Sequence, residues 1–164
     1  MADQASVAIS SSGTFLYVAC GGSTSLNVLS VDSSGRLSTV QTLSPATAND
    51  ELSSVAMNPA GTLLIATKEA ANTVEVFSVD QASGKLSPVA SATAGTRPNS
   101  AAFDKSGDFL YVTNGSSLIS KNNFIAGSDN LSAYAVAKNG QLTQLPHSPF
   151  TTGSAPRSII VVQP

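Results

Sequence analysis

The sequence contains few side chains that could bind a metal ion or act as a nucleophile. Its one cysteine, Cys20, and its one histidine, His147, are too few for a Cys/His zinc site or an internal disulfide. The Gly-x-Ser-x-Gly motif of serine hydrolases is absent. We interpret Cys20 as a small hydrophobic residue at the end of an apolar run and His147 as a surface turn residue.

Two carboxylates flank a turn in the second half of the chain. Asp104 and Asp108 lie on either side of the turn residue Gly107, and carboxylate oxygens are ligands that calcium prefers. The alternative is that they accept hydrogen bonds from the turn amides, a common role of Asp in turns. We favour the second interpretation, and we expect neither a metal ion nor an organic cofactor.

Composition and charge exclude several classes of function. Eight Lys and Arg residues against ten Asp and Glu residues give a formal net charge of −2, and the sequence has no basic run. Nucleic acid and acidic membrane surfaces are therefore not expected partners. The longest apolar run, residues 15–20, is far shorter than the roughly 18 residues of a membrane-spanning helix. The first four residues lack the basic and apolar parts of a secretory signal, and the localisation stays open.

The clearest feature of the sequence is an internal repeat of about 40 to 50 residues. Two apolar runs joined by a glycine turn recur three times, and a second pair of runs follows each time. The turn glycines are Gly13, Gly61 and Gly107 in the first pairs and Gly35, Gly84 and Gly140 in the second. A fourth copy begins at Pro156 and contains only its first run. The repeat predicts units at about 5–45, 52–95 and 98–150, and one strand of a further unit at 157–162.

Each unit is predicted to form a four-stranded antiparallel sheet. The runs are rich in Val, Ile, Leu, Phe and Tyr and are separated by Gly, Asn, Asp and Ser. Apolar side chains fall on both faces of residues 74–79, so the sheet must be covered on both sides. We predict an all-β fold, a partial β-propeller of about three blades plus the innermost strand of a fourth. A β-helix is the alternative, but its repeat is much shorter and lacks antiparallel hairpins.

The predicted topology places the charged loop residues on one face. In an up-and-down sheet the connections from second to third strand, and from fourth strand to the next unit, lie at the same end. Glu69, Arg97 and Arg157 belong to these connections, as does a longer connection at 114–130 that contains Asn114 and Lys121. Loops on a rigid scaffold often bind ligands. The alternative is that these are solvated charges and a tolerated insertion.

The repeat motifs resemble those of the seven-bladed propeller lactonases, the group that includes the propeller type of 6-phosphogluconolactonase. The most similar stretches are Gly84-Lys85-Leu86, Phe109-Leu110-Tyr111-Val112-Thr113-Asn114 and Ser148-Pro149-Phe150-Thr151-Thr152-Gly153. The likeness spans nearly the whole chain, and its motifs are those of the scaffold, which non-catalytic relatives share.

The resemblance also implies a set of site residues. Active members have a Pro-Arg-His sequence before an innermost strand and a glutamate after the second strand of the same blade. Arginine and histidine would polarise the lactone carbonyl and orient water, and glutamate would act as the base. Glu69 matches the glutamate, and Pro156-Arg157-Ser158 keeps the arginine but has serine for histidine. Before the innermost strand of the third unit, Pro98 matches the proline of the Pro-Arg-His sequence but no arginine or histidine directly follows it, and Arg97 precedes it.

Because no unit contains the complete set, two functions remain open. The first is metal-independent hydrolysis of a sugar-acid lactone by a complete ring, with Glu69 and Arg157 as catalytic residues and Arg97, Asn114 and Lys121 as substrate-binding residues. The second is a non-catalytic propeller that binds a partner. Three blades leave both outer sheet faces bare, so we expect the chain to belong to a longer protein or to pair with a second copy.

Overall fold

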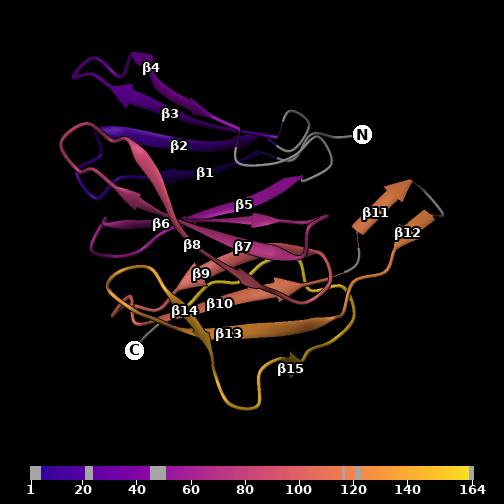
Figure 1. Cartoon of the computed structure of the whole chain (residues 1–164). Helices are drawn as coiled ribbons and strands as arrows, with labels where there is room; N and C mark the ends of the chain where they lie inside the picture. Colours follow the sequence, from indigo (N-terminus) through magenta and orange to yellow (C-terminus); the bar gives the residue numbers. More distant parts are fainter. Residues whose placement is uncertain (1–4, 21–23, 45–50, 116, 121–122, 163–164) are drawn as a thin grey trace.

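The computed structural model describes residues 5–20, 24–44, 51–115, 117–120 and 123–162, and every regular element within them is a β-strand (Figure 1). The all-β prediction is therefore confirmed. No helix in this part of the chain is long and apolar enough to cross a membrane.

Three antiparallel sheets account for most of the strands. Blade 1 contains β1 (Ala5–Ile9), β2 (Phe15–Cys20), β3 (Ser25–Val31) and β4 (Leu37–Leu43). Blade 2 contains β5 (Leu52–Met57), β6 (Leu63–Lys68), β7 (Thr73–Val79) and β8 (Leu86–Thr93). Blade 3 contains β9 (Pro98–Phe103), β10 (Phe109–Asn114), β13 (Asn130–Val136) and β14 (Leu142–Gln144), and β15 (Phe150–Thr151) also pairs with β13.

The blades stack face to face in chain order (Figure 1). Each sheet follows the chain from its innermost to its outermost strand, and the innermost strands β1, β5 and β9 pack side by side. This is the arrangement of a partial β-propeller, in which successive sheets surround a common axis. The C-terminal ends of β2, β4, β6 and β8 therefore lie at the same end of the sheets, as predicted.

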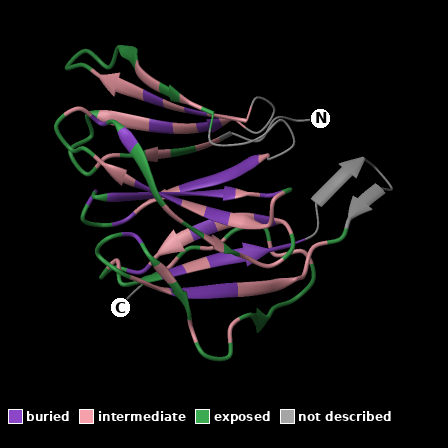
Figure 2. Ribbon diagram, in the orientation of Figure 1, coloured by how far each residue is buried: buried purple, intermediate pink, exposed green. Residues whose placement is uncertain are grey.

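Two apolar clusters hold the blades together, one at each interface. Between blades 1 and 2, Tyr17 and Leu26 pack with Leu64 and Phe77. Between blades 2 and 3, the cluster contains Ile65, Val74, Val76, Leu110, Val112 and Tyr134. Figure 2 shows the buried residues concentrated in the strands of the stacked sheets. Blade 2 is thus covered on both faces, as the apolar residues of 74–79 predicted.

The first turn of each blade is capped by a polar side chain at the same place in the repeat. Ser10 Oγ accepts a hydrogen bond from the amide of Phe15 in blade 1, and Asn58 Oδ1 accepts from the amides of Thr62 and Leu63 in blade 2. In blade 3, the carboxylate of Asp104 accepts a hydrogen bond from the amide of Phe109. The glycines of these turns, Gly13, Gly61 and Gly107, have φ between 68° and 78°, a conformation that side chains disfavour.

The longer connection of blade 3 forms a small hairpin of its own. Strands β11 (Ser117–Ser120) and β12 (Asn123–Ile125) pair antiparallel, and Figure 1 shows them projecting from the end of blade 3. The predicted insertion at 114–130 is therefore partly a β-hairpin, and it lies at the same end as the β6–β7 and β8–β9 connections.

Residues 156–162 run beside β9 but form no strand. The carbonyl of Pro156 accepts a hydrogen bond from Asn99 Nδ2 (2.8 Å), and the amide of Ile159 donates to Ser100 Oγ (3.4 Å). The second bond repeats the one between blades 1 and 2, where the corresponding amide of Val55 donates to Ser6 Oγ (3.0 Å). The segment lies where a further innermost strand would lie, but a strand needs a hydrogen-bonded neighbour. Its place in a fourth blade stays a prediction.

Candidate functional site

Glu69 and Arg97 form a buried ion pair between blades 2 and 3. Glu69 directly follows β6 and Arg97 directly precedes β9. Their side chains are 8% and 13% exposed, and Arg97 Nη2 contacts Glu69 Oε1. An ion pair of this burial has lost most of its water, so its Coulomb interaction is stronger than that of a surface pair. Two of the residues proposed from the sequence are thus in direct contact.

The β6–β7 turn holds the backbone of Arg97 in an unusual conformation. Arg97 has φ of 60° and Asn72, in the turn, has φ of 56°. Asn72 Oδ1 accepts a hydrogen bond from the amide of Arg97 (2.8 Å), and the carbonyl of Asn72 accepts one from Ala94 (2.8 Å). The left-handed region costs free energy for a residue with a side chain. These bonds hold the backbone of this loop in place and offset part of that cost.

The guanidinium keeps one group unused. Among the described residues, the Nε of Arg97 is buried and has no hydrogen-bond partner. A carboxylate beside a guanidinium places a base and a hydrogen-bond donor close together. The pair has the chemical groups that hydrolysis of an ester ring requires.

A second ion pair lies on the opposite side of blade 2. Lys68 Nζ contacts Glu75 Oε2 at 2.7 Å, and the two side chains are 13% and 16% exposed. Lys68 is the last residue of β6, and its register partner on β7 is Thr73. Glu75 lies two residues after Thr73 on the same strand. Lys68 follows Leu64 and Ala66 on the face toward blade 1, and Glu69 follows Ile65 on the face toward blade 3.

Asn114 is completely buried at the end of β10. Its Nδ2 donates to Asn130 Oδ1 (2.8 Å) and to Ser132 Oγ (2.9 Å), both on β13. Ser132 Oγ also accepts a hydrogen bond from the amide of Gly95 (3.3 Å) in the connection that leads to Arg97. Asn114 therefore belongs to a network that connects blade 3 to the loop of Arg97.

Arg157 and Lys121 are not joined to this pair. Arg157 is exposed, and no ion pair or hydrogen bond links its side chain to Glu69 within the described residues. It occupies the repeat position of Ser53 and Asn99, which lie at or near the start of the innermost strands and donate to Pro98 O (2.6 Å) and Pro156 O (2.8 Å). Lys121 lies outside the described residues.

Asp104 acts as a turn cap, the role that the sequence favoured. Its carboxylate accepts hydrogen bonds from Ser106 Oγ (2.5 Å) and from the amides of Ser106 (3.2 Å) and Phe109 (3.0 Å). Burial raises the pKa of Asp104, but these hydrogen bonds outweigh it and hold the pKa below the usual value. Asp108 is exposed on the same turn.

Sequence reasoning missed Asn72, Lys68 and Glu75. Asn72 carried a usable signal, because Asn tolerates the left-handed conformation that a tight turn needs. The pairing of Lys68 with Glu75 could be read only once the β6–β7 register was known, since a shift of one residue would place them on opposite faces.

The family profile described as "Lactonase, 7-bladed beta-propeller" matches residues 6–121. A search of curated proteins finds no match.

Solved structures show the same fold. A proposed 6-phosphogluconolactonase of Bacteroides uniformis has a TM-score of 0.80 at 18% identity, covering 96% of this chain and 43% of its own. One of Bacteroides fragilis has a TM-score of 0.78 at 19% identity, covering 93% and 40%. The periplasmic gluconolactonase of Pseudomonas aeruginosa has a TM-score of 0.74 at 26% identity, covering 91% and 40%.

The chain thus spans about two fifths of the length of these structures. The family profile covers well over half of the chain, and the repeat, the blade topology and the structural neighbours agree with it. The chain therefore belongs to the seven-bladed β-propeller lactonase family.

Proposed function

We propose that a complete ring containing this chain hydrolyses a sugar-acid lactone at the Glu69–Arg97 pair. The buried contact between these two side chains, at the end of the sheets that carries the long connections, is the observation that carries the proposal. Family membership and the similarity to proteins described as lactonases support the substrate class. The chemistry needs no metal ion, because a carboxylate and a guanidinium supply the base and the oxyanion donor.

Each residue has a proposed role in that reaction. Arg97 donates to the lactone carbonyl oxygen and stabilises the negative charge that develops there when water attacks. Glu69 takes the proton of the attacking water. Arg157, in the segment that we predict to begin a fourth blade, would bind the acid or hydroxyl groups of the substrate, as would Lys121. Asn114 is buried, so we assign it to positioning the loop of Arg97 rather than to substrate contact.

Substituting Glu69 tests this proposal. In the closed ring, Glu69→Gln should lower kcat for gluconolactone by about a hundredfold or more, because the base is lost while the shape of the side chain is kept. Proton release during ring opening measures the rate. Breaking one partner of a buried pair also costs about 3–5 kcal/mol of stability, so thermal melting must accompany each assay.

Glu75→Gln is the matched control. It breaks a comparable ion pair in the same blade, on the side away from Arg97. It should lower the melting temperature by a similar amount and leave kcat within about threefold of the unaltered protein. If Glu75→Gln reduces kcat as much as Glu69→Gln does, the loss reflects stability and the proposed site is wrong.

The second candidate function is a non-catalytic binding scaffold. The projecting β11–β12 hairpin favours it, because loops on a rigid scaffold often carry binding surfaces. Under this alternative, removing residues 117–125 should abolish capture of a ligand while Glu69→Gln has no effect. Retained binding after the deletion would exclude the hairpin as the binding element.

A further inference from the structure

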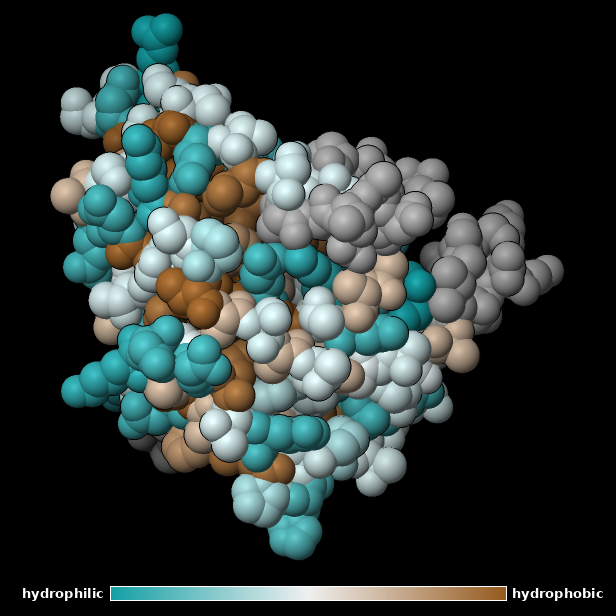
Figure 3. Space-filling view, in the orientation of Figure 1, coloured by the Kyte–Doolittle hydropathy of each residue, from teal (hydrophilic) through white to brown (hydrophobic). Residues whose placement is uncertain are grey.

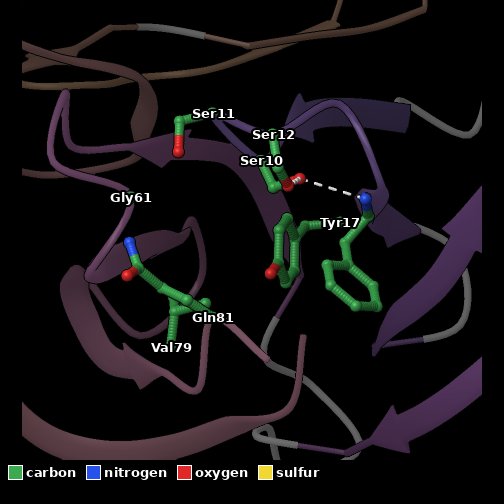
Figure 4. A pocket seen from close by; sticks show the side chains of 8 residues that line it. Ser10, Ser11, Ser12, Tyr17, Gly61, Val79 and Gln81 are labelled. Atoms are coloured by element: carbon green, nitrogen blue, oxygen red, sulfur yellow. Dashed lines mark hydrogen bonds between the residues drawn. The ribbon is translucent and has the colours of Figure 1, made fainter. Parts of the chain in front are cut away.

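A small cavity lies between blades 1 and 2 at the end opposite to Glu69 and Arg97. Its volume is about 170 Å³. It is lined by Ser10, Ser11, Ser12, Phe15, Tyr17, Gly61, Val79 and Gln81 (Figure 4). These residues come from the first turns of blades 1 and 2, from β2, from the end of β7 and, for Gln81, from the β7–β8 turn. Nothing in the proposed lactone chemistry uses them.

The hydroxyl of Tyr17 is the most unusual group in this cavity. Tyr17 is 0% exposed, and within the described residues its hydroxyl has no hydrogen-bond partner. Figure 4 shows the hydroxyl directed toward the side of the cavity formed by Gln81. A buried hydroxyl without a partner costs free energy. A hydroxylated molecule that entered the cavity would recover that loss.

The other polar groups of the cavity are hydroxyls and one amide. Ser10 Oγ lies 3.1 Å from Ser12 Oγ, and Gln81 Nε2 donates to the carbonyl of Ala60 (2.8 Å). That bond leaves the amide oxygen of Gln81 available as an acceptor. Gln81 and Ser12 are exposed, so their side chains can move to admit a molecule.

The lining also indicates the charge and shape of such a molecule. Among the residues that the structure describes, no Lys, Arg, Asp, Glu or His lines the cavity, so none of them would neutralise an ion there. The rings of Phe15 and Tyr17 offer an apolar surface for C–H groups. A cavity of about 150 Å³ holds a molecule of the size of benzene. The match is a neutral compound of about six to eight non-hydrogen atoms with several hydroxyl groups.

The neighbouring interface lacks these features. At the corresponding position between blades 2 and 3, Ile65 replaces Tyr17 and Pro59 replaces Ser11. A Cβ atom at Gly107 would lie 3.3 Å from Pro59 Cδ, so proline packs closely against that turn. The hydroxyl-rich lining is therefore a property of these particular residues and not of the propeller repeat.

We propose that this cavity binds a small neutral polyol, or the hydroxylated end of a sugar, through Tyr17 and Gln81. The site lies on the opposite face from the Glu69–Arg97 pair and is independent of the proposed hydrolysis. A hydroxyl group of the bound polyol would form the hydrogen bond that the Tyr17 hydroxyl lacks. The carbon chain of the polyol would pack against the ring of Phe15.

Titrating the 164-residue chain with erythritol tests the proposal by backbone amide NMR. The expected result is saturable chemical-shift changes confined to the amides of residues 10–17, 61 and 79–81. Tyr17→Phe should weaken binding three- to tenfold, because one hydrogen bond is lost, without lowering the melting temperature. 1-Butanol, which has the same carbon chain and one hydroxyl, should bind at least fivefold more weakly than erythritol.

Tyr111→Phe is the matched control, because Tyr111 holds the same repeat position in blade 3 and does not line the cavity. It should bind erythritol as the unaltered chain does. Gln81→Leu, an exposed substitution that should not disturb folding, should also weaken binding. Shifts that do not saturate, or that spread over the whole surface, would overturn the proposal. Equal affinity of Tyr17→Phe and the unaltered chain would overturn it as well.

Discussion

Polar side chains stabilise the blade turns at the residue scale. Ser10, Asn58 and Asp104 occupy one repeat position and accept hydrogen bonds from the amides of their own turns. Of the three, only Asp104 is ionisable, and its side chain is buried. The first turn of blade 3 should therefore contribute a pH-dependent stability that the first turns of the other two blades, which carry Ser10 and Asn58 at this position, do not contribute.

Asp104→Asn tests this dependence. Because the folded pKa of Asp104 lies below its usual value, its ionised form contributes stability above a pH of about 4, and this contribution is lost as the pH falls through the folded pKa. The variant should be less stable than the unaltered chain at pH 7, and the difference should shrink toward pH 3. Urea midpoints at several pH values measure it.

Asp108→Asn controls for the loss of one negative charge, since Asp108 is exposed on the same turn. Its effect should be small at every pH because exposed substitutions rarely change stability by more than about 0.5 kcal/mol. A difference between Asp104→Asn and the unaltered chain that stays constant from pH 7 to pH 3 would contradict the assigned hydrogen bonds.

At the scale of elements, each blade depends on the faces of its neighbours. Leu64 on β6 is 0% exposed and packs in the cluster that includes Tyr17 and Leu26 of blade 1. A sheet in a repeat protein contacts only adjacent repeats, so stability arises largely at the interfaces between them. Removing a buried side chain at one interface should therefore loosen two blades together.

Leu64→Ala should lower the free energy of unfolding by about 2–5 kcal/mol, through lost burial and the cavity left behind. Denaturant titration followed by circular dichroism measures the change. Leu37→Ala is the comparison, because Leu37 lies on the outermost strand β4 and is 47% exposed. If the two variants lose equal stability, the blade 1–blade 2 cluster is not the main source of stability there.

At the scale of the whole molecule, the outer faces of the stack are bare. Val55 of blade 2 faces blade 1 and is 6% exposed, whereas Val7, at the same repeat position in blade 1, is 57% exposed. Ile160 and Val162 beside β9 are 82% and 76% exposed. Figure 3 presents the side of the stack, where hydrophobic residues of the blades lie among hydrophilic ones. Exposed apolar side chains such as Val7, Ile160 and Val162 favour contact with another protein surface.

Further blades or a second copy would cover these faces. Alone in solution, the 164-residue chain should therefore self-associate, as light scattering coupled to size-exclusion chromatography would show. Replacing Val7 and Ile160 by Lys should shift the chain toward the monomer, because a charge on an interface opposes burial. A chain that is fully monomeric before any substitution would contradict this expectation.

Strand pattern and turn chemistry are local, so the sequence alone predicted the blades. Alternating apolar residues at 74–79 and the turn glycines Gly13, Gly61 and Gly107 depend only on neighbours along the chain. The same periodicity placed Glu69 and Arg97 at one end of the sheets, because antiparallel strands dictate which connections share an end.

Only the tertiary structure decided which side chains meet. Arg97 contacts Glu69 from a left-handed backbone conformation in which its amide donates to Asn72, and no strand pattern encodes the direction of a loop side chain. The sequence predicted Asn114 to be a substrate-binding loop residue, but its side chain is buried and donates a hydrogen bond to Ser132 on β13. Tyr17 has the same strand position as Tyr111, yet only the packing of two blades leaves its hydroxyl in a cavity. Periodicity is set along the chain, whereas these contacts depend on how loops and sheets approach one another.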